Sequence, residues 1–268
     1  MLSIRRILRK YLLNNLSIKG IFNKNYIRFQ EYKFFKFKKK LKYFESGYFK
    51  LTPFISEKEL IDYYKLKYRS LKSNFVNRII DDRAVLHYNF IHQFIDKSQI
   101  NFLNIGSSNG GLSHLLHANE KINIFNHDLH KVKNYYSKRW NYLDSLENLD
   151  IKFDLIYMSH SLEHVADLDI FFKRVNKIIH EKTKIFIEVP NAKHPLTGNF
   201  GKEILPPHTH YFEKKFFESI NQKKLFLFLT NKKTIDNQNT YSLEEGYDVD
   251  ESSFKFIIYL GEGYFNTK

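Results

Sequence analysis

The feature that most restricts the fold is an apolar run that ends in a glycine-containing turn. Residues 100–105, INFLNI, are predicted to form a buried strand, and Gly106-Ser107-Ser108-Asn109-Gly110-Gly111 follows it. A helix is expected from Leu112 to about Ala118. Glycine at 106 allows a tight reversal, and glycine at 110 allows a backbone to pass close to a ligand. Exposed amides at the start of the helix favour a polar or carboxylate-bearing ligand.

The alternation of apolar runs with helical patterns continues along the chain. Asp167 is predicted to cap a helix whose apolar residues recur at helical spacing, and another helix is expected at 213–221. This pattern predicts an α/β fold with a mostly parallel sheet covered by helices on both faces. The last two strands are expected to form an antiparallel pair. Further strands are expected at 122–128, 153–160, 184–191, 225–230 and 254–260.

Positive charge is concentrated before this α/β region. Residues 1–50 hold 14 Lys and Arg against Glu31 and Glu45, so they carry +12 of the net +14 and leave about +2 elsewhere. Three interpretations of this basic, aromatic segment stay open: a solvated face, contact with an anionic membrane or glycan, and, least favoured, contact with nucleic acid. Residues 26–50 look irregular or β-like.

Three segments are therefore expected: a basic aromatic extension at 1–50, a helical lead-in or cap at 51–98, and an α/β domain at 99–268. The lead-in begins a helix at Ser56, which forms a capping box with Glu59, and a second helical stretch covers 76–97.

Cysteine content and hydropathy exclude several classes of protein. The chain has no cysteine, which excludes disulfides, zinc–thiolate sites and a thiol nucleophile. No window reaches the ~18 apolar residues of a membrane-spanning helix. Met1 to Leu16 mixes basic residues into an amphipathic helical pattern that differs from a signal peptide. A cytoplasmic location is expected, with peripheral contact at the inner membrane surface left open.

An acidic residue at the end of the second strand gives the glycine turn a specific meaning. Asp128 lies 22 residues after Gly106, where a carboxylate can accept hydrogen bonds from the ribose hydroxyls of a nucleoside. Together with Leu162-Glu163-His164-Val165 after the 153–160 strand, residues 100–215 resemble the class I S-adenosylmethionine-dependent methyltransferases. The likeness is to the branch with a Leu-Glu-His-Val segment, which includes sugar methyltransferases. It implies a Rossmann-like fold and S-adenosylmethionine as the cofactor.

The resemblance also implies which residues would bind that cofactor. The glycine turn would wrap its methionine part, and Asp128 would hold its ribose. Leu129 would flank the adenine, Asp144 would reach the adenine amino group, and Ser159 and His160 would line the inner wall of the site. Asn104 stands where the family usually has an acid, and Ser108 where a second glycine is usual. Both departures leave open weaker cofactor binding or a catalytically degenerate binding protein. The implied cofactor-binding residues are Asn104, Gly106, Ser107, Ser108, Gly110, Asp128, Leu129, Asp144, Ser159 and His160.

Histidines near two strand ends are candidates for the methyl-acceptor site. His164 is the first candidate for a general base, with Glu163 orienting it or a substrate hydroxyl; the alternative is that both cap and pack the next helix. By the resemblance, His208, His210 and Tyr211 lie on a segment that returns over the active site, and a purely structural loop is the alternative. Histidines at i and i+2 suggest a metal, but no third ligand has a matching spacing, so none is expected.

The acceptor is predicted from a second resemblance. Residues 47–70, GYFKLTPFISEKELIDYYKLKYRS, look like the helical lead-in of methyltransferases that act on nucleotide-linked sugars or related polar metabolites. Some such relatives carry a cysteine zinc ribbon, which this chain lacks. O-methylation of a sugar, nucleotide-linked or part of a capsule or other surface polysaccharide, is the expected reaction. An RNA or lipid-linked acceptor is the alternative.

Overall fold

A computed structural model describes residues 40–64, 82–95, 99–129, 139–194, 208–220, 223–231 and 250–265. The expected helix at 2–16, the basic segment up to residue 39, and parts of both lead-in helices lie outside these ranges. Among the residues described, no helix has both the length and the apolar character needed to span a lipid bilayer.

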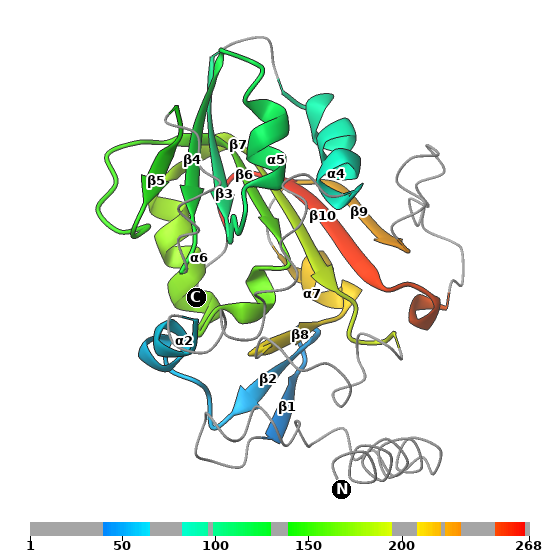
Figure 1. Cartoon of the computed structure of the whole chain (residues 1–268). Coiled ribbons are helices and arrows are strands. Elements are labelled where there is room, and N and C mark those ends of the chain that lie inside the picture. The colour runs from blue at the N-terminus through cyan, green and yellow to red at the C-terminus, as the bar shows by residue number, and fades with distance from the viewer. Residues whose placement is uncertain are drawn as a thin grey trace, which may run out of the picture.

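The centre of the fold is a seven-stranded sheet (Figure 1) with the strand order β5-β4-β3-β6-β7-β10-β9. The first five of these strands pair in parallel, whereas β10 is antiparallel to both β7 and β9. The mostly parallel sheet and its antiparallel strand pair confirm the predicted fold class. The strand bounds are β3 Ile100–Ile105, β4 Ile122–His127, β5 Asn141–Leu143, β6 Phe153–Ser159, β7 Ile179–Pro190, β9 Lys223–Thr230 and β10 Phe256–Glu262.

Helices cover both faces of this sheet because its strands are apolar on both sides. On β7, Phe186 points to the face where α4 and α5 pack, and its neighbours Ile185 and Ile187 point to the face where α6 and α7 pack. All three are fully buried. This alternation explains why residues 185–187 of β7 are apolar at every consecutive position. The helix bounds are α4 Asp82–His92, α5 Gly111–Leu116, α6 Leu168–Lys177 and α7 Lys214–Ser219.

Helix α6 begins where the sequence predicts. The Asp167 carboxylate accepts hydrogen bonds from the amides of Asp169 and Ile170, at 3.0 and 3.1 Å. These bonds and the ammonium of Lys50, 3.0 Å away, hold the pKa of Asp167 below its usual value, against the opposing effect of partial burial. The same carboxylate therefore caps the helix and ties it to the preceding lead-in.

A second, three-stranded antiparallel sheet lies beyond the ends of the large sheet (Figure 1). It has the order β1-β2-β8, with β1 at Lys40–Phe44, β2 at Tyr48–Thr52 and β8 at His210–Phe212. Residues 40–44 and 48–52 are thus strands joined by a turn, mostly within the segment 26–50 that is expected to be irregular or β-like. The expected boundary between residues 50 and 51 falls inside β2. The division into three segments remains an expectation.

The lead-in contributes a short helix and an apolar cluster. Helix α2 (Glu57–Tyr63) starts with the predicted capping box, in which the Ser56 hydroxyl accepts from the Glu59 amide and the Glu59 carboxylate accepts from the Ser56 amide. Its buried residues pack with Tyr211 of β8 in one apolar cluster. The lead-in and β8 are therefore one packing unit, in addition to their strand pairing. The cluster comprises Leu51, Ile55, Leu60, Tyr63, Tyr64 and Tyr211.

The buried face of α6 gives a test of the packing. Phe172 is buried and stacks on Phe265 with ring centroids 4.2 Å apart, whereas Ile170 on the same helix is 51% exposed. Phe172→Ala is expected to lower the free energy of unfolding by about 3–5 kcal/mol through lost burial and a residual cavity. Ile170→Ala should cost under about 1 kcal/mol. Urea unfolding of both variants measures the difference, and equal losses would contradict the assignment of the buried face.

Candidate active site

The candidate cofactor residues gather at one edge of the large sheet. Parallel strands β3, β4, β5 and β6 all end there, so the residues that follow them become neighbours, as in other open α/β sheets. The three-residue strand β5 is not among the strands predicted from the sequence. The residues at or just after the strand ends are Gly106, Asp128, Asp144, Ser159 and His160.

Both turn glycines are required by the local geometry. Gly106 has φ +73°, and a Cβ added there would lie 2.1 Å from Ser161 Oγ. That hydroxyl donates to the Ile105 carbonyl at 2.8 Å, which fixes its position beneath the turn. Gly110, at φ +76°, precedes α5, and a Cβ there would lie 2.8 Å from the Trp140 ring. Both positions combine a left-handed backbone with a close neighbour, so any other residue would strain the turn.

Ser108 adopts the conformation that a glycine would provide. Its φ is +47°, in the left-handed region that favours glycine, and its amide donates to Asp128 Oδ2 at 2.8 Å. The two residues, 20 positions apart in the chain, are therefore directly connected. Ser107 is buried, and its amide and that of Gly106 both donate to the His127 carbonyl. The turn is thus held against the end of β4 by backbone and side-chain bonds.

Asn104 lies beneath the turn, in a buried hydrogen-bond chain. Its Nδ2 donates to Ser113 Oγ at 3.2 Å, and Ser113 Oγ donates to Asn126 Oδ1 at 2.7 Å. The chain links β3, α5 and β4 through uncharged groups. An aspartate at position 104 would place a charge in this buried network, so asparagine is consistent with its surroundings.

The residues assigned to adenine lie at the ends of β4 and β5. His127 Nδ1 lies 2.8 Å from the Leu143 carbonyl, and Tyr142 donates its hydroxyl hydrogen to the Asp128 carbonyl. These bonds bring the exposed Asp144 beside Asp128. Leu129 is partly buried and packs against the lead-in cluster of α2 and β8. The lead-in therefore reaches the edge of the predicted cofactor site.

Glu188 on β7 is a buried carboxylate that is not among the candidates predicted from the sequence. Ser159 Oγ donates to its Oε2 at 2.6 Å, and His160, His87 and Arg83 place nitrogens 3.5, 3.5 and 3.7 Å from the same oxygen. Burial raises the pKa of Glu188, but the charges of these histidines and of Arg83 and a hydrogen bond from His87 hold it well below its usual range. The sequence feature that could identify Glu188 is a glutamate inside the apolar run KIFIEVPN.

His160 is positioned by both chain geometry and charge. Its backbone has φ +52°, and its amide donates to the Glu188 carbonyl at 2.9 Å. Its ring lies between two buried carboxylates, with Nδ1 3.3 Å from Glu163 Oε1 and Nε2 3.5 Å from Glu188 Oε2. It therefore connects the predicted inner wall of the cofactor site with the predicted acceptor site.

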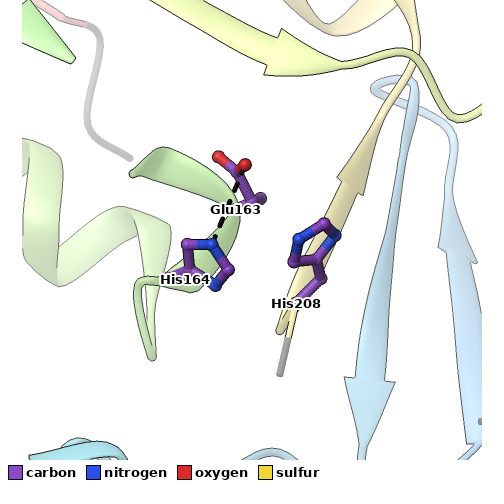
Figure 2. Close-up of side chains that lie close together, drawn as sticks. All are labelled: Glu163, His164 and His208. Atoms are coloured by element: carbon purple, nitrogen blue, oxygen red, sulfur yellow. Dashed lines mark ion pairs between the residues drawn. The ribbon is translucent and has the colours of Figure 1, made fainter. Parts of the chain in front are cut away.

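The acceptor candidates fall into one cluster, with one exception. Glu163 and His164 belong to the short 3-10 turn η4 (Leu162–His164), and His208 precedes β8. Figure 2 shows His164 and His208 facing one another across the space between the two segments, with Glu163 beside His164 on the same turn. The rings of His164 and His208 have centroids 4.7 Å apart, and Tyr211 lies 5.5 Å from His208. Residues 44 positions apart are thus brought together, which no local spacing in the sequence reveals.

His210 is the exception. It is fully buried, with its ring centroid 5.7 Å from Tyr48 and 6.1 Å from Phe212. Burial, reinforced by the positive charge of Lys50 and only partly opposed by Asp167, lowers its pKa to about 3. His210 is therefore a neutral histidine within the packing of the small sheet, separate from the cluster of His164 and His208.

Comparisons with known proteins agree with this architecture. A family model described as a methyltransferase domain matches residues 77–227, more than half of the chain. No curated protein matches its sequence. Among solved structures, the plantazolicin methyltransferase BpumL, in complex with a monoazolic desmethylPZN analogue and SAH, is similar with a TM-score of 0.51 and 11% identity, over 76% of this chain and 94% of that one. This likeness supports the fold.

Other solved structures are similar at lower scores. An S-adenosylmethionine-dependent methyltransferase from Clostridium acetobutylicum gives a TM-score of 0.46 at 13% identity, over 75% of this chain and 99% of that one. A chain from the complex between the Haloferax volcanii Trm112 methyltransferase activator and a methyltransferase gives 0.48 at 10% identity, over 77% and 98%.

The family match and the glycine turn at the sheet edge define the class of the protein. The chain belongs to the methyltransferase-domain family. It is a class I S-adenosylmethionine-dependent methyltransferase, as the resemblance predicts. The residues at the sheet edge fit the cofactor. The turn has glycines at the two positions where a Cβ would clash, Gly106 and Gly110, and the Asp128 carboxylate lies directly beside it.

Asp128 gives the first test of the cofactor site. Asp128→Ala is expected to weaken S-adenosylmethionine binding by about 10- to 100-fold, because hydrogen bonds to a charged group contribute about 1.5–3 kcal/mol each. Asp128→Asn keeps an oxygen that can accept from the Ser108 amide, so it should lose less affinity for S-adenosylmethionine. Calorimetric titration measures both, with the exposed Asp150→Ala as control. Unchanged affinity in folded Asp128→Ala would contradict the assignment.

His210 predicts a specific acid sensitivity. The folded chain keeps this histidine neutral down to about pH 3, whereas the unfolded chain protonates it below its ordinary pKa of 6.5. The contribution of neutral His210 to the free energy of unfolding is therefore complete above pH 6.5. It is lost as the pH falls from 6.5 toward 3, by up to about 1.4 kcal/mol per pH unit. His210→Gln should show a shallower decline in unfolding free energy between about pH 6 and pH 4 in urea titrations. Parallel curves for the two proteins would count against a neutral His210.

Proposed function

We propose that the chain transfers a methyl group from S-adenosylmethionine to a hydroxyl of a sugar, nucleotide-linked or part of a surface glycan. The observation that carries this proposal is the pair of imidazoles, His164 and His208, beside the buried Glu163. A hydroxyl acceptor must lose its proton during methyl transfer, and a histidine has a pKa suited to accepting it near neutral pH.

The side chains around this pair suit a polyhydroxylated acceptor. Glu163 and the two imidazoles offer hydrogen-bonding groups, and the ring of Tyr64 lies 6.3 Å from that of His164. Tyr211 closes the side formed by β8. A sugar presents both hydroxyls and apolar ring faces, which a mixed polar and aromatic surface can bind. Of these two tyrosines, Tyr64 belongs to the lead-in segment that resembles those of sugar methyltransferases.

In the proposed reaction, S-adenosylmethionine supplies an electrophilic methyl group at the sheet edge. His164 accepts the proton of the acceptor hydroxyl, and Glu163, 3.8 Å from His164 Nε2, orients the ring and balances the charge that it gains. His160 lies between Glu163 and Glu188 and thereby positions the residues proposed to bind the acceptor relative to those proposed to bind the cofactor. Alignment of the acceptor oxygen with the methyl group supplies the remaining acceleration.

His164→Ala tests the role of the base. Turnover is expected to fall about 10²- to 10⁴-fold, the range of a general base, while S-adenosylmethionine affinity stays within about twofold. His180→Ala is the matched control, because His180 pairs with Asp154 at 3.0 Å and lies outside the cluster. Equal loss of cofactor affinity and turnover in His164→Ala would show a structural histidine instead.

The acceptor class is tested by a screen of nucleotide sugars and oligosaccharides with methyl-labelled cofactor, read by mass spectrometry. Mass increments of one methyl group on a sugar hydroxyl are expected, abolished by His164→Ala. Labelling of RNA or of a lipid-linked substrate, with none of the sugars modified, would overturn the sugar proposal and leave the enzyme class intact.

A further inference from the structure

The cluster of Glu163, His164 and His208 has the composition of a metal site as well as that of a base. One ligand atom from each residue can be chosen so that all three atoms lie within 4.8 Å of one another. Figure 2 shows the two imidazoles on either side of the space between η4 and the start of β8, with the Glu163 carboxylate beside His164. Spacing along the chain does not reveal this set, because His164 lies 44 positions before His208 and the neighbouring His210 is buried within the small sheet.

Backbone hydrogen bonds hold the two halves of the cluster together. The Thr209 amide donates to the Glu163 carbonyl at 2.8 Å, and the Thr209 hydroxyl lies 2.9 Å from the same carbonyl and within bonding distance of the Val165 carbonyl. Thr209 is itself buried. The main chains that carry the three ligands are therefore fixed before any ion binds, which lowers the entropic cost of assembling a site.

Glu163 supplies a second, independent indication. It is 1% exposed, and within the described residues neither carboxylate oxygen has a hydrogen-bond partner. The nearest cationic candidates, His160 and His164, place nitrogens 3.3 and 3.8 Å from Oε1. A buried carboxylate without hydrogen bonds is costly unless a positive charge compensates it. A bound cation supplies that charge directly.

We propose that Glu163, His164 and His208 bind one divalent transition-metal ion of the Zn²⁺ type. Two imidazoles and one carboxylate form a ligand set that suits Zn²⁺ and similar ions, whereas Mg²⁺ and Ca²⁺ prefer oxygen ligands alone. Ligands about 2.1 Å from a tetrahedral Zn²⁺ are roughly 3.4 Å apart. The distance of 3.8 Å between Glu163 Oε1 and His164 Nε2 is already near this value, and a ligand atom of His208 completes a set within 4.8 Å.

Three protein ligands leave a coordination position open, as in catalytic zinc sites. Water or an acceptor hydroxyl can occupy it, and an ion there makes loss of the hydroxyl proton to solvent easier. This catalytic consequence rests on the proposed function, whereas the binding of the ion does not. With the ion bound, His164 acts as its ligand in place of accepting the proton itself.

The test is metal binding by the full-length chain, purified without a histidine tag and treated with a chelator. Titration with Co²⁺, followed by visible absorption, and with Zn²⁺, followed by calorimetry, should show one equivalent bound. Glu163→Gln, His164→Ala and His208→Ala should each weaken binding at least about 100-fold, and His180→Ala should leave it unchanged. Circular dichroism identifies any variant that fails to fold. His208→Ala, which truncates a partly exposed side chain, keeps the test valid if Glu163→Gln unfolds.

Failure to bind one equivalent of either ion, or equal binding by wild type and all folded variants, would overturn the proposal. Loss of metal binding in only one of the three variants would also overturn the proposal, because the site requires all three ligands. Methyl transfer to the sugar panel, measured separately with and without chelator, distinguishes the two proposals. Transfer without metal binding overturns the metal site alone, and metal binding without transfer overturns the sugar acceptor alone.

Discussion

A single buried carboxylate, Glu188, sets the arrangement of the sheet edge. It lies on β7 with no solvent exposure, where an isolated charge would be strongly unfavourable. Ser159, His160 and two residues of α4, Arg83 and His87, surround it. Helix α4 must therefore pack against this edge for the charge to be tolerated. The position of α4 before β3 and the position of Ser159 and His160 at the end of β6 follow from the same requirement.

Much of the fold follows from sequence because its determinants are local. The apolar runs of β3, β6 and β7, the Asp167 cap of α6 and the Ser56 capping box each depend on residues within a few positions of one another. Strand β5 escapes prediction because three residues are too few to show a period. The small sheet escapes it too, since its central pairing joins Lys50 to His210 across 160 residues of chain.

The candidate site, too, is predictable from sequence only where its determinants are local. The glycine turn and Asp128 can be placed from sequence because each directly follows a recognisable strand. The partnership of His164 with His208 cannot, because it depends on Thr209 bridging to the η4 turn. Glu188 is hidden for a different reason, since two of its partners, Arg83 and His87, come from a helix 101 to 105 residues earlier in the chain. His210 is misleading in sequence because its proximity to His208 says nothing about which way each side chain points.

The serine beneath the glycine turn links the two halves of the site mechanically. Ser161 Oγ occupies the space that a Cβ on Gly106 would need, and Ser161 is also the residue before η4. The loop assigned to the cofactor and the turn that carries Glu163 and His164 are therefore in direct van der Waals contact. A displacement of either one by more than a few tenths of an ångström must be transmitted to the other. The relative placement of the loop assigned to the cofactor and the turn assigned to the acceptor is therefore set by packing at one serine, Ser161.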